Sequence, residues 1–222
     1  AARMYGTVIG LIEVDDLANW PRTDWVPIGT VEFCRAVMAH QGINPPAPLS
    51  YPPLLQPFLK RRIWTSTAGQ VRRSQDPVFV KPQQTKQFTG FVWPGDEMAQ
   101  NEFASIPDDT KVWCSEVIRL QNEWRIYVCN HQILGMARYD DNDTEDLPPD
   151  NSIVQKMVDS FAAAAPAGYS LDVGINDAND TVLVEVNDGW ALGLYKGFHP
   201  AQYLTLIEAR WKELLDSAPV TD

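Results

Sequence analysis

The chain has 222 residues, of which 45% are hydrophobic and 10% aromatic, so it can build a substantial core and is not a largely disordered protein. Its formal net charge of −11 argues against non-specific nucleic-acid binding and against an anionic membrane surface, because both need an excess of Lys and Arg. No apolar run reaches about 18 residues and the first residues lack a signal-peptide pattern, so we expect no membrane span and a cytoplasmic location.

The first third of the chain is predicted to combine a strand, a helix and a connector. Residues 8–14 (VIGLIEV) form an apolar run typical of a buried strand. Thr30 is a candidate N-cap for a helix that runs to His40 and stops at Gly42. Residues 44–57 hold six prolines, which exclude a helix interior or a central strand. We expect a stiff, extended connector around the N-terminal layer, with a proline-rich ligand motif as the alternative.

From Asp76 onward, the pattern changes to short apolar segments typical of strands. Their predicted ranges are 77–81, 88–93, 112–118, 124–128, 133–139, 170–175 and 181–186. The fourth and fifth are expected to form a hairpin with the turn Asn130-His131, because Asn and His tolerate positive φ better than most residues.

Two helices are predicted among and after these strands. The acidic loop 140–150 leads to Ser152, which is expected to cap a helix that ends near Ala164. Residues 200–217 are amphipathic, with an apolar face along one side. Strands interleaved with helices in this way predict an α+β fold.

Several familiar sites are absent from the sequence. There is no GxxxxGK[ST] phosphate loop, no GxGxxG motif and no GxSxG elbow. The histidines and cysteines are too far apart to form a ligand set or a redox pair, so we expect surface or turn histidines and reduced thiols. These residues are His40, His131, His199, Cys34, Cys114 and Cys129.

The most informative segment is Glu185-Val186-Asn187. Side chains alternate along a strand, so Glu185 and Asn187 point the same way, about 6.5–7 Å apart, and Val184 and Val186 are expected to face the core. Asp172 lies in the preceding apolar strand and approaches this pair if the two strands form a hairpin. Two carboxylates and an amide oxygen suit a hard cation such as Mg²⁺, while ordinary solvent-facing acids are the alternative.

A second feature is a row of basic residues among the apolar strands. Lys81 ends its strand and Lys86 follows in a loop. With a two-residue turn, Arg138 pairs with Glu123 and lies on the same face as Arg125, whereas a three-residue turn would put the arginines on opposite faces. Guanidinium groups gathered on one face can hold phosphate or carboxylate oxygens, and surface salt bridges are the alternative.

Taken in order, short segments of the chain resemble the ATP-grasp superfamily. They are VFVKP at 78–82, SEVI at 115–118, EWRIYV at 123–128, GMARY at 135–139, LDVGI at 171–175 and VEVNDGWALGLY at 184–195. The resemblance covers most of the C-terminal two-thirds and is closest to small bacterial and phage ATP-grasp domains.

The resemblance implies a fold and a reaction. Two α+β lobes would hold ATP between them in residues 71–222, after a reduced N-terminal α/β domain with its proline-rich connector in residues 1–70. The activity would be an ATP- and Mg²⁺-dependent ligase that joins a carboxylate to an amine, such as an amino acid or a peptide, through an acylphosphate, with release of ADP and phosphate. An ATP-grasp kinase and a non-catalytic interaction module on the same fold are the alternatives.

Residue by residue, the resemblance implies a nucleotide site and a metal site. Contacts to ATP would come from Lys81 and Lys86 at the phosphates, Glu116, Val117 and Ile118 at adenine, and Glu123 at the ribose hydroxyls. The Mg²⁺ ligands would be Asp172, Glu185 and Asn187. The catalytic contacts to phosphate or acylphosphate would be Arg125, Arg138 and Lys86.

Family members are often homodimers, and the apolar face of residues 200–217 is open to two interpretations. It serves a dimer contact, or it packs on the chain's own sheet. We expect the second.

Overall fold

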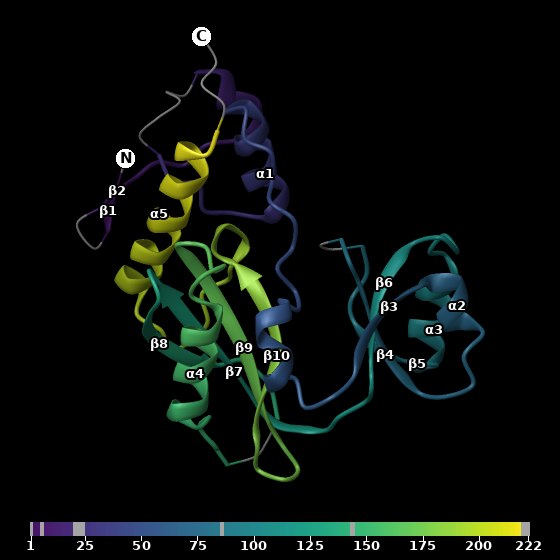
Figure 1. Cartoon of the computed structure of the whole chain (residues 1–222). Coiled ribbons are helices and arrows are strands. Elements are labelled where there is room, and N and C mark those ends of the chain that lie inside the picture. The colour runs from purple at the N-terminus through teal and green to yellow at the C-terminus, as the bar shows by residue number, and fades with distance from the viewer. Residues whose placement is uncertain (1, 5–6, 20–24, 85–86, 143–144, 219–222) are drawn as a thin grey trace.

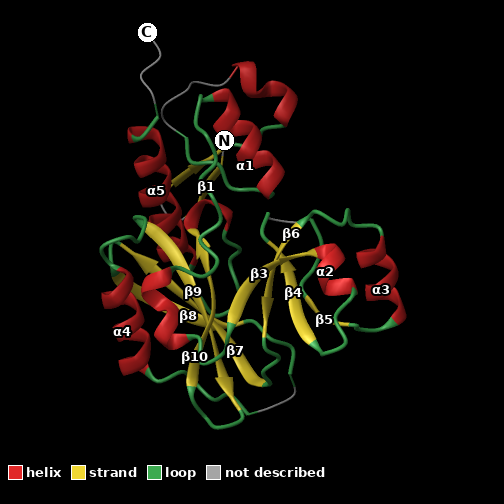
Figure 2. Ribbon diagram, turned by 45° about the vertical axis from the view of Figure 1, so that its right-hand side comes forward, coloured by secondary structure: helices red, strands yellow, loops and turns green. Residues whose placement is uncertain are grey.

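A computed structural model of the chain describes residues 2–4, 7–19, 25–84, 87–142 and 145–218 (Figure 1). Two antiparallel four-stranded sheets form two lobes that lie side by side. Figure 2 shows α2 and α3 on the side of the small sheet that faces away from the large one, and α4 on the far side of the large sheet. The chain is therefore of the α+β class, as the sequence predicted.

The large lobe is built on a sheet of strand order β10-β9-β7-β8. Its strands are β7 (Leu120–Cys129), β8 (Gln132–Arg138), β9 (Gly168–Asn176) and β10 (Thr181–Asp188). One face packs on α4 (Asn151–Phe161), where Leu171 and Val173 of β9 are fully buried. Because side chains alternate, Asp172 between them points to the opposite face.

The small lobe is a continuous segment with sheet order β3-β6-β4-β5. Its elements are β3 (Ile63–Thr67), α2 (Ala68–Arg72), β4 (Val78–Pro82), β5 (Phe91–Trp93), α3 (Glu97–Ala104) and β6 (Lys111–Ser115). Phe103 of α3 is buried against Val80 and Val112. The boundary between residues 70 and 71 stays a prediction, and β3 on its N-terminal side pairs with β6.

The chain crosses between the lobes twice, at residues 59–62 and 116–119. The two crossings are tied together, because Glu116 N donates to Arg62 O at 3.1 Å and Arg62 N donates to the Glu116 carboxylate at 2.9 Å. These crossings form the joint between the lobes.

The N-terminal region lies beside the last helix, α5 (Pro200–Asp216). It contains β1 (Ala2–Met4), β2 (Thr7–Ile9), the 3₁₀ helices η1 (Val14–Asn19) and η2 (Pro53–Phe58), and α1 (Val31–His40). The predicted strand over residues 8–14 is wrong, because β2 ends at Ile9 and Leu11 is 96% exposed. An apolar run is ambiguous by itself, and here it covers a strand end, a loop and the start of η1.

Other local predictions are confirmed. Thr30 caps α1 through its side-chain oxygen, which accepts from Phe33 N at 3.2 Å. Asn130 and His131 form the hairpin turn with φ of 46° and 63°. The cap of α4 is Asp150 rather than Ser152, since the Asp150 carboxylate accepts from the first amides of the helix.

The apolar face of α5 packs on the chain's own sheet, as expected. Leu206 and Ile207 contact the β7 side of the sheet, and Trp211 contacts the cluster around α1. The three cysteines are buried thiols. Within the described part of the chain, no helix combines the length and the apolar character needed to cross a membrane.

Candidate active site

Three polar side chains lie together on the face of the large sheet that α4 does not cover. β9 and β10 form a hairpin in which Glu185 is opposite Asp172 and Asn187 is opposite Ser170. The Asn187 amide donates to Asp172 Oδ2 at 3.0 Å and to Glu185 Oε1 at 3.1 Å. The expected approach of Asp172 to Glu185 and Asn187 is therefore confirmed.

A β-bulge at Val184 produces this arrangement. Leu183 pairs with Val173, the next pair is Glu185 with Asp172, and Val184 is left over. Leu183 is fully buried in the core, whereas Val184 lines a cavity. The expectation that Val184 faces the core is wrong, because an inserted residue moves every later side chain to the other face.

Asp172 is held by Arg125 in a buried, bidentate ion pair. Arg125 Nε and Nη2 donate to the two carboxylate oxygens at 2.8 and 2.7 Å, and the Asp172 side chain is only 2% exposed. Burial opposes the charge of Arg125, but hydrogen bonds and attraction to Asp172 outweigh it and raise the pKa of the guanidinium. The guanidinium also lies 4.9 Å from the ring centroid of Tyr195. Arg125 is thus fixed on several sides.

Glu185 pairs with Lys81 of the small lobe, so this ion pair joins the two sheets. The Lys81 ammonium also lies 4.5 Å from the ring centroid of Tyr51. Burial works against both charges, yet the mutual attraction of the pair lowers the pKa of Glu185 and raises that of Lys81. Both groups are therefore charged near neutral pH.

A cavity of about 350 Å³ lies beside this pair, at the joint between the lobes. Glu116, Val117, Ile118 and Glu123 all line it, together with Arg61 of the other crossing. The sequence-predicted adenine and ribose contacts are therefore brought to one cavity.

Glu123 is held at this cavity by Tyr139. The Tyr139 hydroxyl donates to Glu123 Oε2 at 2.8 Å. Burial and the nearby charges of Asp172 and Asp140 raise the pKa of Glu123, although the hydrogen bond from Tyr139 opposes this rise. The carboxylate is thus available at neutral pH but is sensitive to mild acid.

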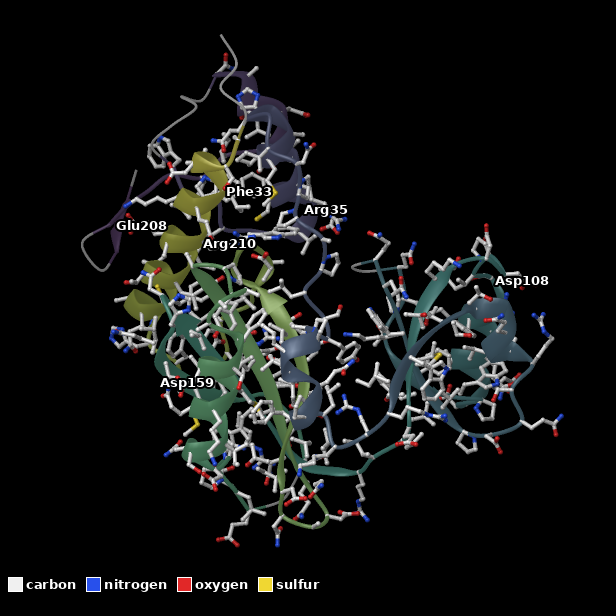
Figure 3. The ribbon with its side chains drawn as sticks, viewed as in Figure 1. Phe33, Arg35, Asp108, Asp159, Glu208 and Arg210 are labelled. Atoms are coloured by element: carbon white, nitrogen blue, oxygen red, sulfur yellow. The ribbon has the colours of Figure 1, made fainter. Side chains whose placement is uncertain are left out.

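A second cavity, of about 480 Å³, lies on the other side of Lys81 and Glu185. Its lining includes Arg35 of α1, the proline-rich residues 45–50 and Trp190. Figure 3 shows Arg35 on the side of α1 that faces the small lobe. Arg35 is half-buried, and no ion pair to it is found among the described residues. This cavity therefore presents a cation to whatever occupies it.

The donor set at Asp172, Glu185 and Asn187 fits a hard divalent cation. Carboxylate and amide oxygens are the ligands that Mg²⁺ takes in proteins, and Mg²⁺ commonly completes its shell with water and substrate phosphates. Among the described residues, no group of three or more His, Cys, Asp and Glu could hold a metal by itself. The site thus suits a cation that shares its ligands with a bound phosphate.

Arg138 does not join this site. A bulge in β8 makes Tyr127 pair with Gly135 and Val128 with Ile133, so Arg138 pairs with Trp124 and not with Glu123. Arg138 and Arg125 therefore lie on opposite faces, and the expectation of one arginine face is wrong. Arg138 instead pairs with Asp140 and Asp146. Lys86 lies outside the described residues.

Several residues of the site carried no signal in the sequence. Arg61 and Tyr51 come from the connector and the first crossing, and they meet the site only through long-range packing. Tyr139 and Tyr195 stack at 5.3 Å beside Arg125. The tyrosines belong to segments similar to the ATP-grasp pattern, but their spacing alone does not indicate contact.

A family model described as an ATP-grasp domain, the second family of its clade, matches residues 58–206, which is more than half of the chain. The matched range contains both lobes and all of the polar residues on the sheet face. No curated protein matches the chain.

Solved structures with a similar fold include three enzymes. The ATP-grasp ligase PsnB, complexed with minimal precursor, Mg and ADP, is 15% identical, with a TM-score of 0.42 over 62% of this chain and 47% of that chain. N5-carboxyaminoimidazole synthetase from Staphylococcus aureus, complexed with ADP, is 11% identical, with a TM-score of 0.46 over 68% and 46%. Macrocyclase MdnC, bound with precursor peptide MdnA from Microcystis aeruginosa MRC, is 14% identical, with a TM-score of 0.47 over 71% and 58%. The chain spans about half the length of these structures.

Proposed function

The chain belongs to the ATP-grasp domain family whose model it matches, and from this membership we propose that it is an ATP- and Mg²⁺-dependent ligase that joins a carboxylate to an amine. One observation carries the proposal. The ion pair of Lys81 and Glu185 lies between a cavity at the lobe joint and a second cavity on the N-terminal side, where a phosphate chain would have to pass.

ATP would enter the first cavity. The backbone of Glu116–Ile118 would hold adenine, and the Glu123 carboxylate would accept hydrogen bonds from the ribose hydroxyls. Lys81 would turn from Glu185 to the phosphate oxygens, to which an ammonium donates strongly. This exchange would free Glu185 for a cation.

Asp172, Glu185 and Asn187 would hold Mg²⁺, which when bound neutralises charge on the phosphate oxygens. Arg125 would keep Asp172 ionised and oriented. Arg138, on the opposite face, has no part in this proposal. A contact of Lys86 with phosphate stays a prediction.

The acid substrate would occupy the second cavity. One of its carboxylate oxygens would attack the γ-phosphorus of ATP, and the bond to the bridging oxygen would break so that ADP leaves. The amine would then attack the acyl carbon, lose a proton and displace inorganic phosphate. No nucleophilic side chain is needed, because positioning and charge neutralisation carry the reaction.

Calorimetric titration with ATP, with and without Mg²⁺, tests the nucleotide site. We expect Mg²⁺-dependent binding by the wild type and its loss in the double variant Glu185→Ala, Asn187→Ala. Asp159→Asn, an exposed change on α4, is the control and should bind like the wild type. A wild type that fails to bind millimolar ATP would contradict the proposal.

The reaction class is tested by products. A ligase releases ADP and inorganic phosphate only when both an acid and an amine are present. ADP formation with a phosphorylated product and no free phosphate would identify a kinase instead.

A further inference from the structure

Arg61 makes an unusual set of contacts at the first crossing between the lobes. Its Nη1 donates to Leu183 O at 2.7 Å and to Leu59 O at 3.1 Å, and its Nη2 donates to Val184 O at 2.9 Å. The side chain is half-buried, and no carboxylate forms an ion pair with it among the described residues. Burial lowers the pKa of this guanidinium. Arg61 therefore directs its charge at backbone carbonyls rather than at an acid.

The two carbonyls from β10 belong to the bulge. β10 is an edge strand, so its outer carbonyls have no strand neighbour there, and a bulge further disrupts the ladder. Arg61 supplies donors to both residues at the point where the register changes. A planar guanidinium can bridge two adjacent carbonyls, which a single ammonium cannot do in the same way.

The bulge decides which face Glu185 occupies. If the pairing of Leu183 with Val173 continued without an inserted residue, Glu185 would be opposite Leu171, whose side chain lies in the core. Asn187 would follow to the same face. With the bulge, Glu185 is opposite Asp172 and the three polar groups meet.

We infer that Arg61 is a positioning residue, which fixes the Val184 bulge and thereby sets the metal dependence of nucleotide binding through Glu185. The inference rests on the proposed function. It concerns a residue that acts through backbone carbonyls and need not touch the cation.

Direct contact with the nucleotide is the competing role, because Arg61 also lines the first cavity. The two roles give different results. A positioning residue affects only the gain in ADP affinity that Mg²⁺ provides, whereas a contact residue affects ADP affinity in the absence of Mg²⁺ as well.

The experiment is calorimetric titration of ADP, with and without Mg²⁺, on the wild type, Arg61→Ala and Arg61→Lys. We expect Arg61→Ala to keep its Mg²⁺-free ADP affinity and to lose roughly 10- to 100-fold of the Mg²⁺-dependent gain, as when a partner that orients a metal ligand is removed. Arg61→Lys should recover part of that gain. Arg62→Ala, at the adjacent exposed arginine, is the matched control and should behave like the wild type.

Three results would overturn the inference. They are an unchanged Mg²⁺-dependent gain in Arg61→Ala, an equal loss of ADP affinity with and without Mg²⁺, and the same loss in the Arg62→Ala control. If Arg61→Ala does not fold, Arg61→Lys decides, and a gain equal to that of the wild type would count against it. A wild type that binds no ADP in Mg²⁺ would overturn the proposed function, and this inference with it.

Discussion

Lys81 of β4 and Glu185 of β10 form an ion pair between sheets of different lobes, although 104 residues separate them in sequence. The pair leaves Glu185 neutralised without a metal, and it leaves Lys81 occupied without a phosphate. A ligand that takes one partner must therefore provide for the other. Binding of the nucleotide and of the cation is expected to be coupled for this reason.

Lys81→Met tests this pair. The change removes a charge-assisted contact of about 1.5–3 kcal/mol, so we expect roughly 10- to 100-fold weaker binding of ATP. It also leaves Glu185 without its cation, and the free energy of unfolding should fall by about 1–3 kcal/mol, since the Glu185 side chain is 28% exposed and partly solvated.

Calorimetry and chemical denaturation measure the two effects of Lys81→Met. Lys212→Met, at an exposed lysine of α5, is the control. Equal ATP affinity in Lys81→Met and the control would contradict the assigned phosphate contact.

Tyr139→Phe tests the support of Glu123. The hydroxyl of Tyr139 stabilises the ionised Glu123, so its removal should raise the pKa of Glu123 further above the usual range. ADP binding, which needs the carboxylate as an acceptor, should then weaken on acidification at a higher pH than in the wild type. ADP affinity measured between pH 5 and 8 checks this, with a cost of about 0.5–1.5 kcal/mol at neutral pH. Superimposable pH profiles would exclude the role.

Asp140→Asn tests the loop after β8. Burial opposes the charge of Asp140, but hydrogen bonds from Arg138 and from the amides of Glu123 and Asn142 lower the pKa of Asp140 to about 2. A lowered carboxyl pKa contributes stability that is complete above about pH 4 and is lost as the pH falls towards 2. The variant should be about 1–2 kcal/mol less stable than the wild type at pH 6, and the difference should vanish near pH 2. Urea denaturation at several pH values measures it, and a constant difference would contradict the assignment.

Arg35→Ala tests the second cavity. Arg35 lies outside the range matched by the family model and lines the cavity without an ion-pair partner among the described residues. We expect unchanged binding of ADP in Mg²⁺, because the first cavity is untouched. The KM for the acid substrate should rise roughly tenfold or more, since a charge-assisted contact is lost. A steady-state assay of ADP release measures the KM, and weaker ADP binding would show that Arg35 serves the nucleotide instead.

The sequence predicted the hairpin that carries the site but not its registers. Positive-φ residues at 130–131 marked one turn, and the alternation of Glu185 and Asn187 marked one face. The bulge at Val184 and the extra residue before Gly135 in β8 each shift pairing by one position, and neither has a distinctive residue pattern. One shift brought Glu185 to the site, and the other removed Arg138 from it.

Contacts between distant segments explain the remaining differences. The carbonyl partners of Arg61 are 122 and 123 residues away, so no local spacing indicates them. Likewise, Tyr51 reaches Lys81 from a connector whose prolines indicate only an extended chain. Periodicity indicates which face a side chain occupies, whereas tertiary packing decides what lies opposite.

The hydrogen bonds between Arg62 and Glu116 have a consequence for how this protein can be rearranged. They place the entry and the exit of the small lobe next to each other, so residues 63–115 are an insertion with adjoining ends. Segments of this kind are exchanged more readily than any other, because replacing them leaves the host sheet uncut. A small lobe from another family member, grafted between these two residues, would inherit the nucleotide-binding face of the large sheet and bring its own lysine to it.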